Sequence, residues 1–414
     1  MSRYTGESGF AHGEIPAVGI LVVNMGTPDA PTPAALRRYL KEFLWDPRVV
    51  EMPRLVWWLI LNGIILNTRP RRSALAYQRV WTTEGSPLLI YTRRQAAALE
   101  TKLRTRIGSP LHVAVGMRYG NPSIRSGLDA LHAQRCRRIL VLPLYPQYAA
   151  ATTASTFDAV FDVLSTWRWV PELRTIAHYH DDPNYILALA NSIRESWGEQ
   201  SLPNRGVEQT LSPETQRADK SVHPTAESHV GRPDTPVRPS SACPEKLLFS
   251  FHGTPKASLL AGDPYHCHCH KTARLVAETL QLPPERWQVA FQSRFGRAEW
   301  LQPYTDVTLK QWGRDGVKSV DVICPGFSSD CLETIEEVGV ENRDNFLHSG
   351  GGRFRYIPAL NDRPGHIAAL ASLVERHLHG WVIQKAEWDD AAVERKAEQS
   401  RRRAEEMKAN GRKI

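Results

Sequence analysis

Short runs rich in Val, Ile and Leu alternate along the chain with longer amphipathic segments. This alternation is typical of parallel sheets covered by helices on both faces, so we predict an α/β fold. Ligands of such open sheets bind beyond the carboxyl ends of the strands, and we therefore look for chemistry there. The candidate strands are 19–25, 111–117, 138–144, 246–251, 287–292, 319–324 and 354–357.

The longest apolar run, LVWWLILNGIIL at 55–66, has about a dozen residues where a membrane-spanning helix needs roughly twenty. We therefore predict that it does not span a bilayer. Two interpretations carry equal weight. The run is either a buried core helix or an apolar lip that dips into a membrane surface, which Trp57 and Trp58 would suit.

Two further segments differ from the rest of the chain. Residues 198–245 are rich in Pro, Ser, Thr and charged residues and contain no aromatic residue, so we predict a disordered insertion. Residues 384–414 are charged and favour a helix but hold few large apolar residues. We predict a solvated, charged helical tail there.

Composition narrows the class of protein. A chain of 414 residues, 42% hydrophobic and 23% charged, is long enough for two globular domains and an extension. The first twenty residues lack the features of a secretory signal, so we expect a cytoplasmic protein whose six cysteines are reduced. Much of the basic excess behind the net charge of +8 lies outside any coherent groove, and we expect no nucleic-acid partner.

His252 stands where a buried strand ends and the turn Gly253, Thr254, Pro255 begins. A histidine at such a place can bind a borderline metal through a neutral ring nitrogen, or take a proton near neutral pH. A lone histidine more often caps a helix or bonds within a turn, and that alternative stays open.

Glu333, Glu337 and Glu341 follow the strand at 319–324 and are spaced by four. On an α-helix they drift by about 40° per step and form one acidic stripe, and a π-helical turn keeps them nearly aligned as well. Like charges four apart destabilise a helix, so a purely structural helix would tend to avoid this pattern. The alternative is a solvated acidic face, against which the interleaved apolar residues indicate burial.

If these two strand ends meet in one cleft, His252 and Glu333 offer an imidazole and a carboxylate to Fe²⁺. Glu337 and Glu341 then offer a path for the incoming cation or for outgoing protons. Metal insertion into a porphyrin needs such a pairing, because two pyrrole N–H protons must leave as the metal arrives.

Nine motifs in order resemble the ferrochelatases from about residue 19 to about residue 379. They are VVNMGTP (22–28), GSPL (85–88), GMRYGNP (116–122), LYPQY (144–148), SFHGTP (250–255), GDPY (262–265), FQSRFG (291–296), EWLQPYT (299–305) and SDCLET (329–334). The resemblance implies a chelatase-like fold of two Rossmann-like domains, each with a parallel four-stranded sheet flanked by helices. We expect them at 17–168, with the apolar lip, and at 169–380, with the metal site and the insertion.

The resemblance also implies roles for individual residues. It makes His252 and Glu333 the catalytic, iron-facing pair and places Glu337 and Glu341 in an acidic π-helical ladder. Met25 corresponds to a residue that touches the macrocycle opposite the histidine. The remaining implied substrate contacts are Arg118 and Tyr119 beside the site, Arg69, Tyr77 and Ser86 along the lip or propionate side, and Trp300 in the pocket, where ordinary packing is the alternative.

The cysteines depart from part of the family. Ala150 stands where animal members have a cluster ligand, and the C-terminal cysteine group is missing, so we predict no [2Fe–2S] cluster and no required cofactor. Cys267 and Cys269 in HCHCH either bind a metal or merely begin a helix. Cys331 stands where the family usually has a histidine.

The expected partners are Fe²⁺ and protoporphyrin IX, with peripheral contact to the inner membrane surface. Coproporphyrin III is the alternative substrate, and users of it usually have a tyrosine at the position of Met25. A sirohydrochlorin-type chelatase usually lacks the lip, and a non-catalytic porphyrin carrier would need neither His252 nor the ladder. The turn NMGTPDAPTP lacks the pattern GxGxxG, which argues against a nucleotide-binding oxidoreductase.

Overall fold

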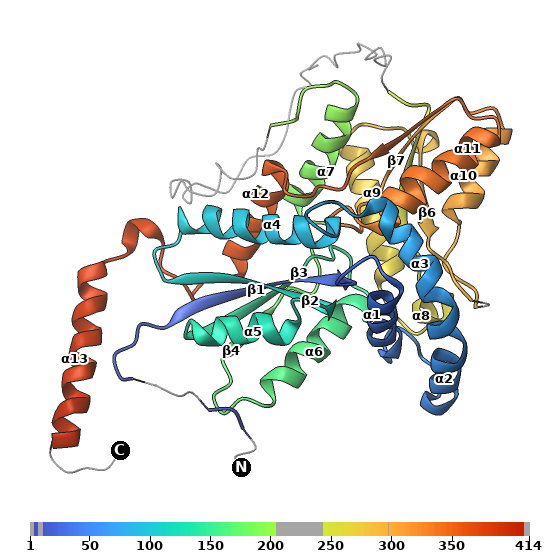
Figure 1. Cartoon of the computed structure of the whole chain (residues 1–414). Coiled ribbons are helices and arrows are strands. Elements are labelled where there is room, and N and C mark those ends of the chain that lie inside the picture. The colour runs from blue at the N-terminus through green and yellow to red at the C-terminus, as the bar shows by residue number, and fades with distance from the viewer. Residues whose placement is uncertain (1–3, 7–10, 204–242, 297, 410–414) are drawn as a thin grey trace, which may run out of the picture.

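Two parallel four-stranded sheets form the framework of the molecule (Figure 1). The computed structural model describes residues 4–6, 11–203, 243–296 and 298–409. The strand orders are β2-β1-β3-β4 and β6-β5-β7-β8, so both sheets have the same topology, and the predicted α/β fold is confirmed. The strands are β1 (Ala17–Thr27), β2 (Leu111–Gly120), β3 (Cys136–Pro143), β4 (Glu172–Thr175), β5 (Lys246–His252), β6 (Trp287–Gln292), β7 (Ser319–Ile323) and β8 (Arg353–Ile357).

Helices cover both faces of each sheet. The first half contains α1 (Pro33–Trp45), α2 (Arg54–Ile60), η1 (Leu61–Ile65), α3 (Leu66–Val80), α4 (Pro87–Arg104), α5 (Ile124–Ala133), η2 (Ala150–Ala154) and α6 (Ser155–Leu164). The remainder contains α7 (Pro183–Ser196), α8 (Lys256–Leu260), α9 (Tyr265–Thr279), η3 (Pro284–Arg286), α10 (Thr305–Arg314), η4 (Glu333–Asn342), α11 (Arg343–His348), α12 (Pro364–His377), η5 (Lys385–Glu387) and α13 (Asp390–Ala409).

The central strands β1 and β5 are buried almost throughout because helices cover both of their faces. Their apolar sequences AVGILVV and KLLFSF made them easy to predict. The strand β4 escaped prediction because its sequence, ELRT, is short and polar and lies at the sheet edge. It pairs with β3 beyond residue 168, so the first sheet extends past the expected boundary between the two halves.

The two halves share one continuous hydrophobic core. A single cluster of buried residues contains Ile20 and Leu142 from the first sheet and Phe249 and Ile357 from the second. The helix α12 packs against both α4 and α7, and Figure 1 shows these three helices gathered between the sheets. The carboxyl ends of the two sheets are therefore held in a fixed relation.

The apolar run at 55–66 has one buried and one exposed face. Trp57 is buried beside α1, where its ring N–H donates to the carbonyl of Leu44 at 2.6 Å. The opposite face is open to solvent, with Leu55 76% exposed. Among the described residues no helix is long and apolar enough to cross a membrane, as predicted. The exposed large apolar side chains, called the lip face below, are Leu55, Val56, Trp58, Leu59 and Ile64.

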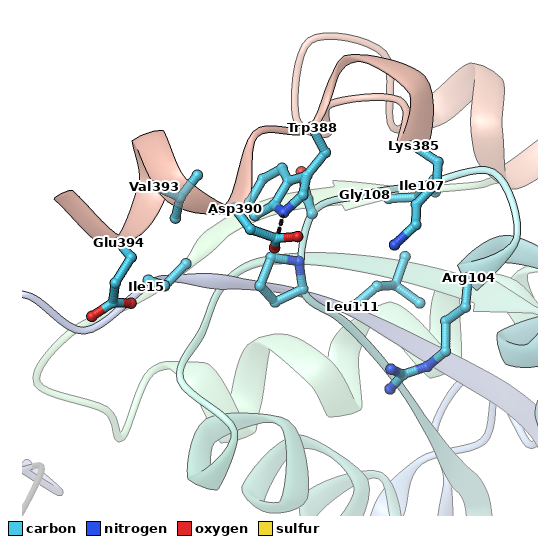
Figure 2. Close-up of a pocket in the computed structure, with 12 residues that line it drawn as sticks. Ile15, Arg104, Ile107, Gly108, Leu111, Lys385, Trp388, Asp390, Val393 and Glu394 are labelled. Atoms are coloured by element: carbon cyan, nitrogen blue, oxygen red, sulfur yellow. Dashed lines mark hydrogen bonds between the residues drawn. The ribbon is translucent and has the colours of Figure 1, made fainter. Parts of the chain in front are cut away.

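The C-terminal segment forms the charged helix predicted for it, whereas the predicted disorder of the internal insertion is not tested. Most of the predicted insertion, 204–242, lies outside the described residues. The helix α13 is solvated, with Ala397 and Ala404 buried, and stands away from the body in Figure 1. Figure 2 shows the pocket of about 410 Å³ that separates this tail from the first half. Trp388 forms part of one wall. A Cβ at Gly108 would lie 2.3 Å from the Cβ of Trp388, so the packing of the tail against the first half requires glycine at position 108.

Candidate active site

His252 is the last residue of β5 and is half-buried. Its Nδ1 lies 2.7 Å from the carbonyl oxygen of Gly253. Because a carbonyl only accepts, Nδ1 carries the proton in this bond, and the lone pair of the neutral ring is on Nε2. This nitrogen is therefore the one available to a metal or a proton.

The turn after His252 is packed too tightly for a side chain. A Cβ at Gly253 would lie 2.9 Å from the carbonyl oxygen of Gln292 and 3.1 Å from the ring of Trp300. Trp300 is buried, its ring N–H donates to the carbonyl of Phe295 at 2.9 Å, and the two rings lie 4.9 Å apart. Trp300 thus supports the turn that holds His252, which is the packing role named as its alternative.

Glu333 begins the π-helix η4, as the ladder hypothesis expected. The carbonyl oxygen of Glu333 accepts a bond from the side chain of Gln292 at 3.3 Å. Gln292 is the β6 residue that pairs with His252 in the sheet. The structure therefore brings His252 and Glu333, far apart in the sequence, to either side of one residue at the carboxyl end of the second sheet.

The charge of Glu333 acts on two buried tyrosines of the first half. Burial raises the pKa of Tyr77 well above its usual value, and the charge of Glu333 raises it further. The pKa of Tyr39 is raised by burial first, then by Tyr77 and Glu333. Tyr39 in turn donates to the carbonyl of Gly26 at 3.2 Å, directly after Met25.

The strand residue after Met25 must be glycine. Gly26 has φ +108°, and a Cβ there would lie 1.8 Å from the carbonyl oxygen of Tyr119, with which it pairs across the sheet. Met25 is half-buried near the end of β1, at the carboxyl edge of the first sheet. Its contact with the macrocycle stays a prediction.

Glu337 binds the loop after β6. Its carboxylate accepts from the backbone N–H of Ser293 at 2.7 Å and from the hydroxyl of the same residue. Burial raises the pKa of Glu337 to about 7, helped by the charges of Glu333 and Glu341 and opposed by the bonds from Ser293. A carboxyl with that pKa exchanges protons near neutral pH.

A cavity of about 230 Å³ lies beside the ladder. Glu337 and Glu341 both line it, whereas Glu333 does not. The carboxylate of Glu337 is half-buried and Glu341 is exposed, so the acidic wall runs from the interior to the surface. Two of the three ladder residues thus share this acidic cavity, and Glu333 lies outside its lining.

The helix α3 ties the first half to η4. Tyr77 packs in a small cluster with Leu332, and Arg79 forms an ion pair with the buried Glu336. The guanidinium of Arg69 lies 5.4 Å from the ring of Phe295, on the loop after β6. Arg69 and Tyr77 therefore lie at the junction between the halves, and their contact with the substrate stays a prediction.

Three of the residues predicted to contact the substrate make polar contacts with other side chains of the first half. Tyr119 is fully buried and its hydroxyl donates to Asp46 at 2.8 Å. Arg118 pairs with the same carboxylate and donates to the hydroxyl of Ser155 at 2.6 Å. Ser86 is buried at the start of α4, where it accepts from Thr27 at 2.9 Å. Tyr119 and Ser86 are both buried in this structure, and their contact with the substrate stays a prediction.

The sequence reasoning missed Gln292 and Ser293. Both belong to the motif FQSRFG, which entered only as part of the resemblance. Each directly follows or ends the strand predicted at 287–292, so the rule that ligand sites lie at carboxyl ends would have identified them.

The two cysteines of the HCHCH motif lie in different environments. Cys269 is fully buried and Cys267 is exposed, because residues two apart on the helix α9 point to opposite sides. Cys331 is buried next to Glu333, and burial raises the pKa of its thiol well above the usual value. Cys269 and Cys331 are therefore packed inside the protein, whereas the thiol of Cys267 faces solvent.

Comparison with known proteins identifies close relatives. A family model described as Ferrochelatase matches residues 17–378. The ferrochelatase of Thioalkalivibrio sulfidiphilus is 54% identical over 402 residues, covering 97% of this chain and 98% of that protein. That of Nitrosococcus oceani is 50% identical with the same coverage. Among solved structures, SirB from Bacillus subtilis with Fe³⁺ aligns over 87% of this chain and 95% of that chain, with 12% identity and a TM-score of 0.45.

Proposed function

The chain belongs to the ferrochelatase family, and from this premise we propose that it uses protoporphyrin IX and works through His252 and Glu333. The protein is an enzyme of haem biosynthesis that inserts ferrous iron into a porphyrin. The observation that carries the proposed roles is the position of Gln292, paired with His252 in the sheet and bonded to Glu333.

Iron insertion forms bonds from the metal to the pyrrole nitrogens and releases two protons. His252 takes a proton at Nε2, because Nδ1 is committed to Gly253. Glu333 provides the carboxylate that ligates the arriving iron or accepts the second proton. Both groups come from the protein itself, so the reaction needs no resident cofactor.

Glu337 and Glu341 transfer protons or the incoming cation between the site and solvent. The pKa of Glu337, raised to about 7, suits a group that accepts a proton and releases it again. The acidic cavity beside it favours a divalent cation, so the same wall serves iron entry or proton exit. Fe²⁺ enters as substrate and leaves within the porphyrin.

The lip face supports both protoporphyrin IX and membrane contact. Its exposed apolar side chains lie on α2 and η1, and the exposed Arg69, Arg71 and Arg72 follow on α3. Apolar side chains flanked by arginines suit the boundary of an anionic bilayer. We propose that the protein is cytoplasmic, docks peripherally there, and receives its apolar substrate from the membrane.

An anaerobic assay with Fe²⁺ and either porphyrin, followed by metalloporphyrin absorbance, tests the proposal. We expect turnover with protoporphyrin IX to exceed turnover with coproporphyrin III. In Glu333→Gln and in His252→Ala the rate should fall by about 10²- to 10⁴-fold, as loss of an acid–base group does. The control Glu278→Gln changes an exposed carboxylate of α9 and should leave the rate unaltered.

Three outcomes would contradict it. Faster turnover of coproporphyrin III would show that this porphyrin, and not protoporphyrin IX, is the preferred substrate. Full activity in Glu333→Gln would remove this residue from the reaction. A wild-type chain that binds porphyrin without turnover would be a carrier instead.

A further inference from the structure

A second cluster of metal-ligating side chains lies in the loop between β4 and α7. It consists of His178, His180 and Asp181. One ligand atom from each of the three lies within 4.8 Å of the other two. None of these residues takes part in the iron-insertion site described above. His178 is exposed and Asp181 half-buried, so an ion can reach the cluster from solvent.

His180 supplies the independent indication of a ligand. Its side chain is 3% exposed, and within the described part of the chain its Nδ1 has no hydrogen-bond partner. The nearest carboxylate oxygen, Oδ1 of Asp181, lies 3.8 Å away. A buried polar atom without a partner costs about 1–3 kcal/mol, so such atoms call for an explanation.

The ring of His180 is held in a fixed orientation. It stacks on His268 of α9, with centroids 3.7 Å apart and planes inclined by 9°. The Nδ1 of His268 accepts from the backbone N–H of Tyr148 at 3.2 Å. A metal bound by an imidazole lies in the plane of that ring, so the parallel His268 cannot share an ion with His180. His268 is therefore a positioning residue.

We propose that His178, His180 and Asp181 form a binding site for a divalent transition cation of the Zn²⁺ class. Two imidazoles and one carboxylate are an established ligand set for such ions, with water in the fourth position. Bonds of about 2.0–2.1 Å place tetrahedral ligand atoms roughly 3.3 Å apart, so ligand atoms that now lie up to 4.8 Å apart must approach by up to about 1.5 Å. The exposed side chain of His178 is free to make that movement.

Lys271 is the group with which the metal competes. Its ammonium lies 2.5 Å from Oδ2 of Asp181, leaving Oδ1 on the side of His180. The carbonyl of His180 also accepts from Thr272 at 2.8 Å. The cation would be held by this loop alone, and the bond from Thr272 would keep the loop attached to α9 if Lys271 were displaced.

Co²⁺ binding to the full-length chain, freed of metal by a chelator, tests the proposal. We expect one equivalent with visible ligand-field absorption, present also in Glu333→Gln, which separates it from the iron-insertion site. In His178→Ala and Asp181→Asn the affinity should fall by more than the ~10-fold that loss of an outer partner costs. In Lys271→Ala the affinity should rise, because Asp181 loses its competing cation.

The control His379→Ala removes an exposed histidine outside the cluster and should retain the wild-type spectrum. Far-UV circular dichroism of each variant verifies that it folds. Unchanged Co²⁺ binding in both His178→Ala and Asp181→Asn would overturn the proposal, and so would weaker binding in Lys271→Ala.

Discussion

At the scale of single residues, Glu337 links protonation to both activity and stability. Burial raises the pKa of its carboxyl to about 7, compared with 4.5 for a free glutamic acid, so the carboxyl is neutral below about pH 7. As a proton acceptor it must be ionised, so wild-type turnover should rise with pH through about 7. The replacement Glu337→Gln should remove this limb of the pH profile and lower the rate at pH 8 by about 10- to 100-fold.

The same shift predicts a pH-dependent difference in stability. The folded-state pKa lies above the unfolded value, so the contribution of Glu337 is fully present below pH 4.5 and lost as the pH rises through 7. Glu337→Gln should therefore match the wild type near pH 4.5 and exceed its unfolding free energy by roughly 1–3 kcal/mol at pH 8. Denaturant titrations at both pH values measure this difference.

Glu341→Gln is the matched control, because this exposed carboxylate lines the same cavity. Its replacement should change the unfolding free energy by less than about 0.5 kcal/mol at either pH. An equal gain in both variants at pH 8 would assign the effect to general charge repulsion along the ladder and contradict the role of burial.

The sequence identified residues whose side chains have suitable chemistry, but it did not predict where each of those side chains points. His252 and Glu333 were identifiable because each follows a buried strand, and parallel strands gather such residues at one edge. Tyr119 and Ser86 were expected at the ligand because the resemblance transfers residue identity. Their orientation depends on Asp46 and Thr27, whose contacts with them no local pattern encodes.

At the scale of elements, the apolar run illustrates a question that pattern alone could not answer. Its length correctly excluded a membrane span. Because nearly every position is apolar, no polar stripe marked which side would be buried. The contact with α1 decides it by covering Trp57 and Leu61 and leaving Trp58 and Leu59 open.

The lip face should govern binding to lipid. In the double variant Trp58→Ser, Leu59→Ser we expect binding to anionic vesicles to weaken by at least about tenfold, since each side chain buries apolar area in the interface. Vesicle co-sedimentation measures it. Val307→Ser alters an equally exposed side chain on α10 and should bind as the wild type does. Equal binding by the double variant would show that the lip face does not enter the bilayer.

The π-helix η4 was expected from the resemblance, and the spacing of its acidic residues alone suited an α-helix as well. Its bonds to the loop after β6 and to α3 separate the roles of neighbouring carboxylates: Glu336 pairs with Arg79, while Glu337 turns to Ser293. Such a division depends on tertiary partners. Sequence spacing therefore predicted the stripe but not its separation into two environments.

At the scale of the whole molecule, the shared core makes the two halves one unit of stability. The helix α12 follows the second sheet in the sequence yet packs on α4 of the first half. Amphipathic patterning predicts that such a helix is buried without naming its partner. This is why the boundary between domains was the least predictable feature of the fold.

The substitution Leu370→Ala in α12 tests whether the two halves unfold as one unit. The side chain is fully buried in the common core, so its truncation should cost about 2–5 kcal/mol of unfolding free energy. Denaturant unfolding followed by tryptophan fluorescence and by far-UV circular dichroism should show one transition, shifted equally in both signals. The control Leu347→Ala, more exposed on α11, should shift it far less. Two separate transitions, of which one moves, would contradict a shared core.

A continuous core also limits how a rigid macrocycle can enter. Hinge bending between the sheets would expose buried surface at about 25 cal/mol per Å², a cost that rises with every degree of opening. The segment formed by α2, η1 and the start of α3 packs on α1 through a hydrophobic cluster of its own, separate from the common core. Displacing this segment from α1 would therefore expose only that smaller cluster, whereas opening the sheets would expose the common core.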